Sequence, residues 1–368
     1  MIPYGKQCLD KSDIDAVVKA LKSPFLTQGP KVLEFENALA KYCGSKYAIA
    51  VSNGTAALHL AYLVAGLKEG DEVITTPNTF VATSNMLLAV GAKPVFCDIR
   101  LDTYNIDETK IEGLINKKTK AIVPVHFAGG ACEMDTILKI AKKYKLKVIE
   151  DGCHALGSVY KKKPIGGIGD MTVMSFHAVK AITTGEGGAI LTNSKKSYDR
   201  LLSLRSHGIH KDKKGFNVMT EMGYNYRITD IQCALGLSQL ERLPYFVEKR
   251  RVIVKKYEKL IGGIKEIILP IESENVLSGW HVYVIRTVKE KDRFPLYNFL
   301  KEKGIGVNFH YPAVYSHPYY RKNGYAKTKL KNTDLYHKTA ITLPIHPLLS
   351  DKDINFIAKT LKDFFKKD

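Results

Sequence analysis

The sequence lacks the features that mark several classes of protein. Its most apolar stretch, residues 56–66, is much shorter than the roughly 20 residues of a membrane-spanning helix, and its first residues carry no apolar signal-peptide segment. The six cysteines lie far apart without a C-x-x-C pair, so neither a disulfide framework nor a cysteine-based metal site is indicated. We therefore expect a cytoplasmic chain with reduced thiols, no membrane segment and no bound metal ion.

Arginine is scarce for so basic a chain. The 368 residues include 56 lysines and arginines against 37 acidic residues, a formal net charge of +19, but only ten of the basic residues are arginine. The arginine guanidinium group forms bidentate hydrogen bonds with phosphates and bases, which lysine does not. The lysines here are also scattered rather than clustered with aromatic residues. The charge favours a solvated lysine-rich surface and no nucleic-acid partner. Attraction of an anionic ligand, or a basic DNA-binding regulator, is the alternative.

Strand and helix signals alternate from about residue 31 to 240, with no internal repeat or low-complexity linker. Helix signals fall at residues 32–42, 56–65, 80–90 and 135–144. Strand signals fall at residues 47–51, 72–75, 94–98, 121–124, 148–151, 172–176 and 189–191. This alternation predicts an α/β fold with a mostly parallel central sheet and helices on both faces.

The pattern changes near residue 245. A helix is predicted over 229–240, with an interruption at Pro244 and a separate basic helix over 247–261. A strand at 281–286 and helices at 296–303 and 353–365 then indicate a smaller α+β unit. We predict a large α/β domain over residues 1–245 and a small C-terminal α+β domain over 246–368, with about the first 12 residues packing on the small domain.

Ligands of open α/β sheets bind at the carboxyl ends of the strands, so the residues that follow each strand are candidates for a binding site. Residues 52–57, Ser-Asn-Gly-Thr-Ala-Ala, follow the first strand and open a helix. A glycine there lets the backbone approach a ligand, and the free N–H groups of the helix start favour an anion. Neither G-x-x-x-x-G-K-[ST] nor a suitably placed G-x-G-x-x-G occurs, which argues against a P-loop nucleotidase or a dinucleotide-binding fold.

Two ionisable residues follow later strands. Asp151 ends the strand at 148–151, where a buried carboxylate needs a partner; its other interpretation is a helix N-cap. Lys180 follows the strand at 172–176 and precedes a glycine cluster at 184–188. Burial there would lower the pKa of the lysine and make it a nucleophilic amine, although a lysine on a surface turn is the common case.

The three signals together suit one cofactor. Pyridoxal 5′-phosphate needs N–H groups for its phosphate, a carboxylate for its pyridinium nitrogen and an amine for its aldehyde. The helix start at residues 53–55, Asp151 and Lys180 would supply all three from one edge of the sheet. The sequence therefore predicts pyridoxal phosphate as the cofactor, with Lys180 and Asp151 as the catalytic residues.

Almost the whole chain resembles the DegT/StrS family of sugar aminotransferases, which have the fold type I architecture of pyridoxal-phosphate enzymes. The resemblance rests on ordered motifs at residues 26–30, 52–58, 70–80, 150–157, 175–188 and 223–227. Within the family the chain is most similar to the transaminases of pseudaminic acid biosynthesis, through residues 176–180, 205–208 and 310–311. Ala181, residues 52–54 and Pro312 depart from that branch, which leaves the particular sugar open.

The resemblance implies a transaminase that moves the amino group of L-glutamate to a 4-keto-6-deoxy nucleotide sugar. The acceptor would be UDP-2-acetamido-2,6-dideoxy-β-L-arabino-hex-4-ulose, and the product UDP-4-amino-4,6-dideoxy-N-acetyl-β-L-altrosamine, on a route to flagellin glycosylation. Another 3- or 4-keto sugar linked to UDP or dTDP is the alternative. Some relatives carry a histidine in place of the lysine and are sugar 3-dehydratases, so Lys180 favours the transaminase. Intact Lys180 and Asp151 argue against a catalytically idle scaffold.

The resemblance also assigns residues to the cofactor. Phe80 would stack on the ring, with Ala155 or His154 near the other face, although Phe80 and His154 also suit ordinary core positions. Asn225 would reach the phosphate of the second subunit, which implies a homodimer with composite active sites. The expected cofactor-binding set is Gly54, Thr55, Phe80, Asp151, His154, Ser175, Lys180 and Asn225.

The sugar pocket is assigned in the same way. It would draw on the N-terminal segment, on residues 24–27 and on residues 310–313, with Arg227 at the substrate diphosphate. The expected substrate-binding set is Tyr4, Pro24, Phe25, Leu26, Thr27, Arg227, His310, Tyr311, Pro312 and Ala313.

Overall fold

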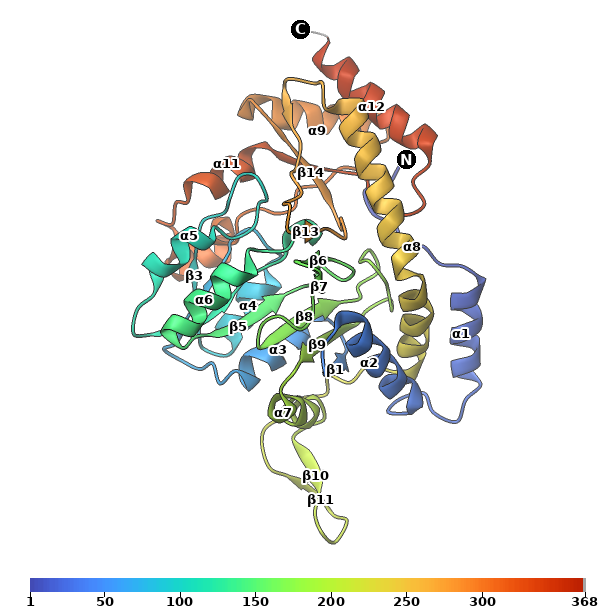
Figure 1. The fold of residues 1–368 in the computed structure, drawn as a ribbon, viewed down its shortest axis with the longest axis vertical. Coiled ribbons are helices and arrows are strands. Elements are labelled where there is room, and N and C mark those ends of the chain that lie inside the picture. Colours follow the sequence, from blue (N-terminus) through green and yellow to red (C-terminus); the bar gives the residue numbers. More distant parts are fainter. Residues whose placement is uncertain (367–368) are drawn as a thin grey trace.

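The computed structural model describes residues 1–366 and centres on a seven-stranded sheet (Figure 1). The strand order is β1 (Tyr47–Val51), β9 (Gly188–Thr192), β8 (Met171–Ser175), β5 (Lys147–Asp151), β4 (Thr119–Val123), β2 (Glu72–Thr75) and β3 (Lys93–Phe96). Strand β9 pairs antiparallel with β1 and β8, and the other pairings are parallel. Six strands therefore run in one direction and end at one edge of the sheet.

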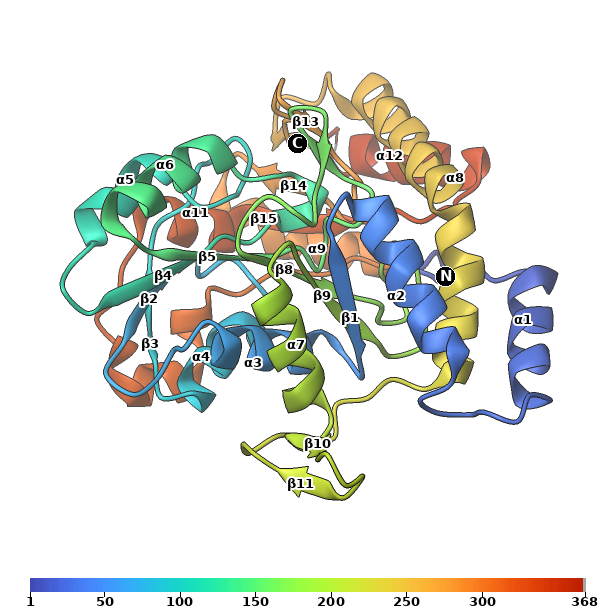
Figure 2. The same ribbon diagram turned by 60° about the horizontal axis from the view of Figure 1, so that its bottom comes forward.

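Helices cover both faces of this sheet (Figure 2). One face carries α2 (Pro30–Cys43), α6 (Met134–Tyr144) and the first half of α8 (Asp230–Ile261); the other carries α3 (Gly54–Val64), α4 (Ala82–Ala89) and α7 (Lys195–Arg205). Alternation along β1 explains the two cores, because Ala48 and Ala50 join the first while Ile49 and Val51 join the second. The predicted α/β class with a mostly parallel sheet is confirmed.

Helix α8 runs without a break through Pro244, so the predicted interruption is wrong. A proline inside a helix costs about 3 kcal/mol, because it lacks an N–H and crowds the preceding turn. Here Leu243 and Phe246 are buried in the core of the large sheet on either side of the proline, and their packing offsets that cost. Among residues 1–366, no helix, α8 included, has the length and apolar character needed to cross a membrane.

The C-terminal part has its own sheet and core. Strand β14 (Tyr283–Thr287) lies between β12 (Ile267–Ile268) and β15 (Ala340–Leu343), with α9 (Arg293–Glu302), α11 (Lys331–Thr339) and α12 (Asp351–Phe365) around them. Along α8, the core of the large sheet extends to Val247 and that of the small sheet starts at Ile253. Ile2 pairs with Ile305 and packs on the small core. The domain division at residue 245 stays a prediction.

The sequence-based predictions missed α7, α11, β12 and β15, and also helix α1 and a β-hairpin. Helix α1 (Lys11–Leu21) packs along α8, where the buried Asp13 carboxylate accepts hydrogen bonds of 2.7 Å from both Gln239 and Arg242. A hairpin of β10 (Ile209–Lys211) and β11 (Asn217–Met219) projects from the body of the molecule in both views. The remaining short elements are α5 (Glu108–Ile111), β6 (Val159–Tyr160), β7 (Lys163–Pro164), β13 (Val276–Leu277) and α10 (Pro318–Tyr320).

Candidate active site

A cavity of about 930 Å³ opens at the carboxyl edge of the large sheet. Residues from the α/β part around the large sheet supply most of its wall. Tyr4 of the N-terminal segment and His281, Asn308, His310 and Tyr311 of the C-terminal part supply the rest. Ten residues of the predicted site line it: Tyr4, Gly54, Thr55, Phe80, Asp151, His154, Ser175, Lys180, His310 and Tyr311.

The start of α3 forms one end of the cavity. Asn53 caps the helix by accepting the N–H of Ala56 at 2.8 Å. The N–H groups of Gly54 and Thr55 belong to the first turn, where no intrahelical carbonyl is available to them. A Cβ on Gly54 would lie 3.1 Å from the Cβ of Ser175, so a glycine keeps this end of the cavity open. The arrangement favours an anion of the size of a phosphate group.

Asp151 lies at the end of β5 with only 4% of its surface exposed. Its Oδ2 accepts the hydroxyl of Thr83 at 2.6 Å, and its Oδ1 accepts the N–H of Cys153 at 3.1 Å. No helix begins after Asp151, so the alternative interpretation as a helix N-cap is wrong. Both hydrogen bonds hold the carboxylate in place at the cavity, where it can meet a cationic group of a ligand.

Lys180 lies on the loop after β8, half-buried in the wall of the same cavity. Burial lowers the pKa of its amine below the ordinary value, while Cys153 and Asp151 act in the opposite direction. The alternative of a surface lysine on a turn is therefore wrong. A desolvated amine of this kind is both a nucleophile and a proton carrier.

Imidazole and phenol groups form another part of the cavity wall. His154 Nδ1 accepts the N–H of Ala128 at 3.3 Å, so the neutral ring carries its proton on Nε2, which lies 3.1 Å from the hydroxyl oxygen of Tyr311. The ring of His281 lies 4.4 Å from that of His154. Burial lowers the pKa of His154 and His281 well below the ordinary value, and lowers that of His310 to about 4. The wall is thus polar but uncharged.

Phe80 is 59% exposed and lies in the cavity, with its ring centre 6.0 Å from that of Tyr311. The alternative interpretation of Phe80 as an ordinary core residue is therefore wrong. His154 is 7% exposed, so it both packs in the interior and faces the cavity. The exposed ring of Phe80 suits stacking on a flat ligand.

Other residues of the predicted set lie elsewhere in the chain. Arg227 lines a second cavity of about 260 Å³ beside the buried Glu36–Arg205 ion pair. Ala313 is buried in an aromatic cluster around Phe96. The predicted residues that do not line the large cavity are Pro24, Phe25, Leu26, Thr27, Asn225, Arg227, Pro312 and Ala313. The roles predicted for these residues stay predictions.

Several cavity residues were not predicted. The hydroxyl of Thr83 donates to Asp151. The only feature of the sequence that points to Thr83 is its position one turn after Phe80, at a helix start. His281 comes from the segment before β14, and Tyr226 from the loop before α8. Their positions depend on how distant segments pack, which neither periodicity nor spacing reports.

The residues present fit pyridoxal phosphate. The phosphate needs N–H donors, which α3 supplies; the ring nitrogen needs a carboxylate, which Asp151 supplies; and the aldehyde needs an amine, which Lys180 supplies. The cavity lies at the upper end of the usual range for ligand sites, so it leaves room for a substrate beside the cofactor.

Replacement of Lys180 tests this assignment. The Lys180→Ala variant should lose the visible absorbance of a lysine-bound cofactor, because no other amine lines the cavity among residues 1–366. It should still bind the cofactor through α3 and Asp151, seen as a rise in melting temperature on adding pyridoxal phosphate. Lys6→Ala is a control outside the cavity. Visible absorbance retained in Lys180→Ala would show that another lysine holds the cofactor.

The buried imidazoles predict a loss of stability in acid. Because the folded chain lowers the pKa of His310 from 6.5 to about 4, the unfolded chain binds more protons below pH 6.5, and the free energy of unfolding should fall from there toward pH 4. His310→Gln should remove up to about 3 kcal/mol of that fall, measured by urea unfolding at both pH values. An unchanged pH dependence in the variant would contradict the burial of a neutral ring.

Comparisons with known proteins identify the family. The model of the DegT/DnrJ/EryC1/StrS aminotransferase family matches residues 7–362. The chain is 42% identical to a Campylobacter jejuni protein named UDP-4-amino-4,6-dideoxy-N-acetyl-beta-L-altrosamine transaminase, over 100% of this chain and 98% of the relative. It is 38% identical to the Bacillus subtilis spore coat polysaccharide biosynthesis protein SpsC, over 99% and 97% of the two chains.

Solved structures match over the full length as well. The Helicobacter pylori aminotransferase PseC, involved in pseudaminic acid biosynthesis, superposes with a TM-score of 0.95 at 36% identity and covers 100% of both chains. The putative sugar aminotransferase Spr1654 of Streptococcus pneumoniae, solved in a PMP form, gives a TM-score of 0.96 at 32% identity, again over 100% of both chains. A PLP form of Spr1654 matches equally well. The chain therefore belongs to the DegT/DnrJ/EryC1/StrS family and is a pyridoxal-phosphate-dependent nucleotide-sugar aminotransferase.

Proposed function

We propose that the chain transfers the amino group of L-glutamate to C4 of UDP-2-acetamido-2,6-dideoxy-β-L-arabino-hex-4-ulose, in pseudaminic acid biosynthesis. The observation that carries the chemistry is the meeting of Lys180, Asp151 and the start of α3 on one cavity. The named sugar is supported by the identity of 42% to the altrosamine transaminase over the whole chain. The SpsC relative, at 38%, is why another UDP- or dTDP-linked keto sugar is the second candidate.

Lys180 would act on protons at two carbon atoms. When bound, pyridoxal phosphate supplies the electron sink that makes the Cα proton of the amino acid acidic. The Lys180 amine, with its pKa lowered by burial, is then able to take that proton and later to deliver one to C4 of the sugar. A single base that faces both substrates in turn requires that they occupy the same cavity.

Asp151 would hold the cofactor ring nitrogen in its protonated state. The hydroxyl of Thr83 and the N–H of Cys153 both donate to its carboxylate, and these neutral donors do not cancel its negative charge. That leaves the charge free to act on the ring. The uncharged wall of His154, His281 and His310 would meet the polar hydroxyl and carbonyl groups of the sugar.

The proposed assembly is a homodimer with composite sites, in which Asn225 reaches the partner's cofactor phosphate. Support comes from the β10–β11 hairpin, whose side chains Phe216 and Met219 are 66% and 67% exposed. A lone hairpin is at best marginally stable in water, so a second subunit packed against it would stabilise it. Arg227 is proposed to contact the substrate diphosphate. We place the enzyme in the cytoplasm, in line with its six free cysteines.

A panel of keto sugars tests the substrate. Incubation with L-glutamate and 4-keto or 3-keto sugars linked to UDP or dTDP, followed by NMR of the products, should give a 4-amino sugar from the UDP-linked 4-keto compound. Lys180→Ala serves as the inactive control. Turnover of a 3-keto or dTDP-linked sugar without turnover of the UDP-linked 4-keto sugar would overturn the proposed substrate and leave the family unaffected.

Mixing two inactive variants tests the composite site. If Lys180 and Asn225 act in one site from different subunits, Lys180→Ala and Asn225→Ala proteins should each be weak or inactive alone. After joint unfolding and refolding, half of the dimers contain one intact site each, so activity should recover to about a quarter of wild type. No recovery, with mixed dimers confirmed by mass spectrometry, would show that both residues act within one subunit.

A further inference from the structure

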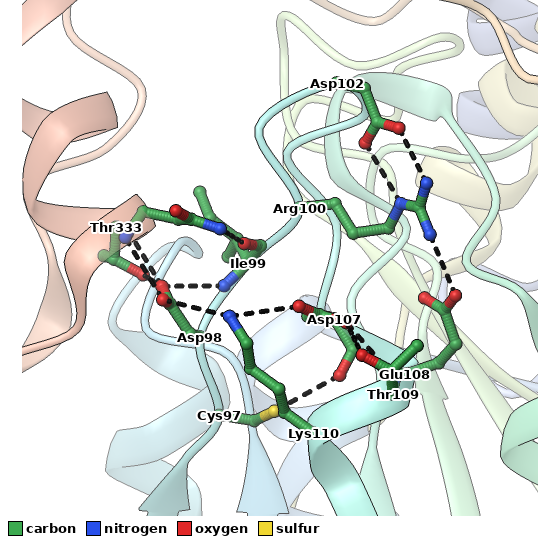
Figure 3. Close-up of polar contacts among 11 residues, drawn as sticks. Cys97, Asp98, Ile99, Arg100, Asp102, Asp107, Glu108, Thr109, Lys110 and Thr333 are labelled. Atoms are coloured by element: carbon green, nitrogen blue, oxygen red, sulfur yellow. Dashed lines mark hydrogen bonds and ion pairs between the residues drawn. The ribbon is translucent and has the colours of Figure 1, made fainter.

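The carboxylate of Asp98 joins the large sheet to the start of α11 (Figure 3). Asp98 follows β3 and is 6% exposed. It accepts the N–H of Asn332 at 3.1 Å, and both the N–H and the hydroxyl of Thr333 at 2.9 Å. Helix α11 has no capping side chain of its own, so a residue more than 200 positions away satisfies its first donors.

This contact is reinforced by neighbouring groups. The side-chain amide of Asn332 donates to the carbonyl of Ile99 at 2.7 Å, and Lys110 donates to Asp98 at 3.4 Å. Burial acts to raise the pKa of Asp98, but the N–H groups of Asn332 and Thr333 hold it below the ordinary value. The carboxylate is therefore ionised where it meets the positive end of the α11 dipole.

Helix α11 in turn holds the cavity wall. Tyr336 lies one turn after Thr333 on the same face of the helix, and its hydroxyl donates to the carbonyl oxygen of His310. Strand β15 follows α11 directly, and the hydroxyl oxygen of Thr342 lies 2.8 Å from Nδ1 of the same histidine. The His310 backbone and ring are thus both fixed by the unit that Asp98 anchors, and the adjacent Tyr311 reaches His154.

We propose that Asp98 is a positioning residue for the keto sugar, acting through α11 on the placement of His310 and Tyr311 in the cavity. The proposal rests on the proposed function in taking these two residues as part of the sugar side of the cavity. The far end of their segment has a separate anchor, since Val314 donates its N–H to the carbonyl of Pro77 at 3.0 Å. Loss of the Asp98 contacts would therefore shift His310 and Tyr311 without releasing the segment.

Steady-state kinetics of Asp98 variants test the proposal. Asp98→Asn keeps acceptor oxygen but loses the charge, and Asp98→Ala loses both. We expect the KM for the keto sugar to rise by about 3- to 10-fold, more in Asp98→Ala than in Asp98→Asn, at nearly constant kcat. The visible absorbance of the bound cofactor should be unchanged, because Asp151 ends β5 and Lys180 follows β8, both strands of the large sheet. Asp102→Asn, on the same loop but without contact to α11, is the matched control.

Two further measurements separate positioning from general loss of stability. NMR titration should give a higher pKa for the His310 ring in Asp98→Asn than the value of about 4 in the wild-type chain, because a loosened segment admits water. Tyr336→Phe should raise the same KM, and the Asp98→Asn/Tyr336→Phe double variant should be less than additive, because both changes interrupt one connection. The proposal would be overturned by variants whose melting temperature falls while their KM for the keto sugar is unchanged.

The wild-type protein distinguishes a wrong substrate from a wrong positioning role for Asp98. The KM comparison uses whichever keto sugar the wild type converts in the panel, so failure of the UDP-linked 4-keto sugar overturns the proposed function alone. If the wild type converts a sugar and the Asp98 variants match its KM, the positioning role fails and the function stands.

Discussion

Desolvation of one lysine beside one buried carboxylate is the constraint on which the rest of the site depends. An amine in water is protonated and unreactive at neutral pH, and burial at the sheet edge lowers the pKa of Lys180 toward the range where it can exchange protons. The carboxylate of Asp151 has hydroxyl and backbone donors around it in place of water. Neither condition would hold on a surface loop, so the site requires the closely packed edge of a buried sheet.

The topology accounts for how residues far apart in sequence reach that edge. Six of the seven strands run in one direction, so the ends of β1, β5 and β8 bring the start of α3, Asp151 and the loop of Lys180 together. The C-terminal part closes the cavity from the other side with neutral imidazoles. The large positive charge of the chain is a property of its lysine-rich surface, whereas the chemistry uses a few buried groups whose net charge is small.

The fold and the centre of the site could be predicted from sequence because they depend on local patterns. Strand ends, glycines and the order of ionisable residues gave the sheet, Lys180, Asp151 and Gly54. Thr83, His281 and the Asp98–α11 contact could not be predicted, because each depends on packing between segments far apart in the chain. The predicted interruption at Pro244 failed for the same reason. The local rule for proline predicts a break in the helix, but packing against the surrounding core keeps α8 continuous. The roles of Arg227 and residues 24–27 stay predictions, since these residues do not line the large cavity.

The most direct measurement is the site at which the cofactor attaches. Borohydride reduction of the protein loaded with pyridoxal phosphate fixes the cofactor to the amine that holds it, and peptide mass spectrometry then identifies that residue. We predict a single modified peptide, with the pyridoxyl group on Lys180. Modification of a different lysine, or none at all in a protein that turns over its substrates, would contradict it.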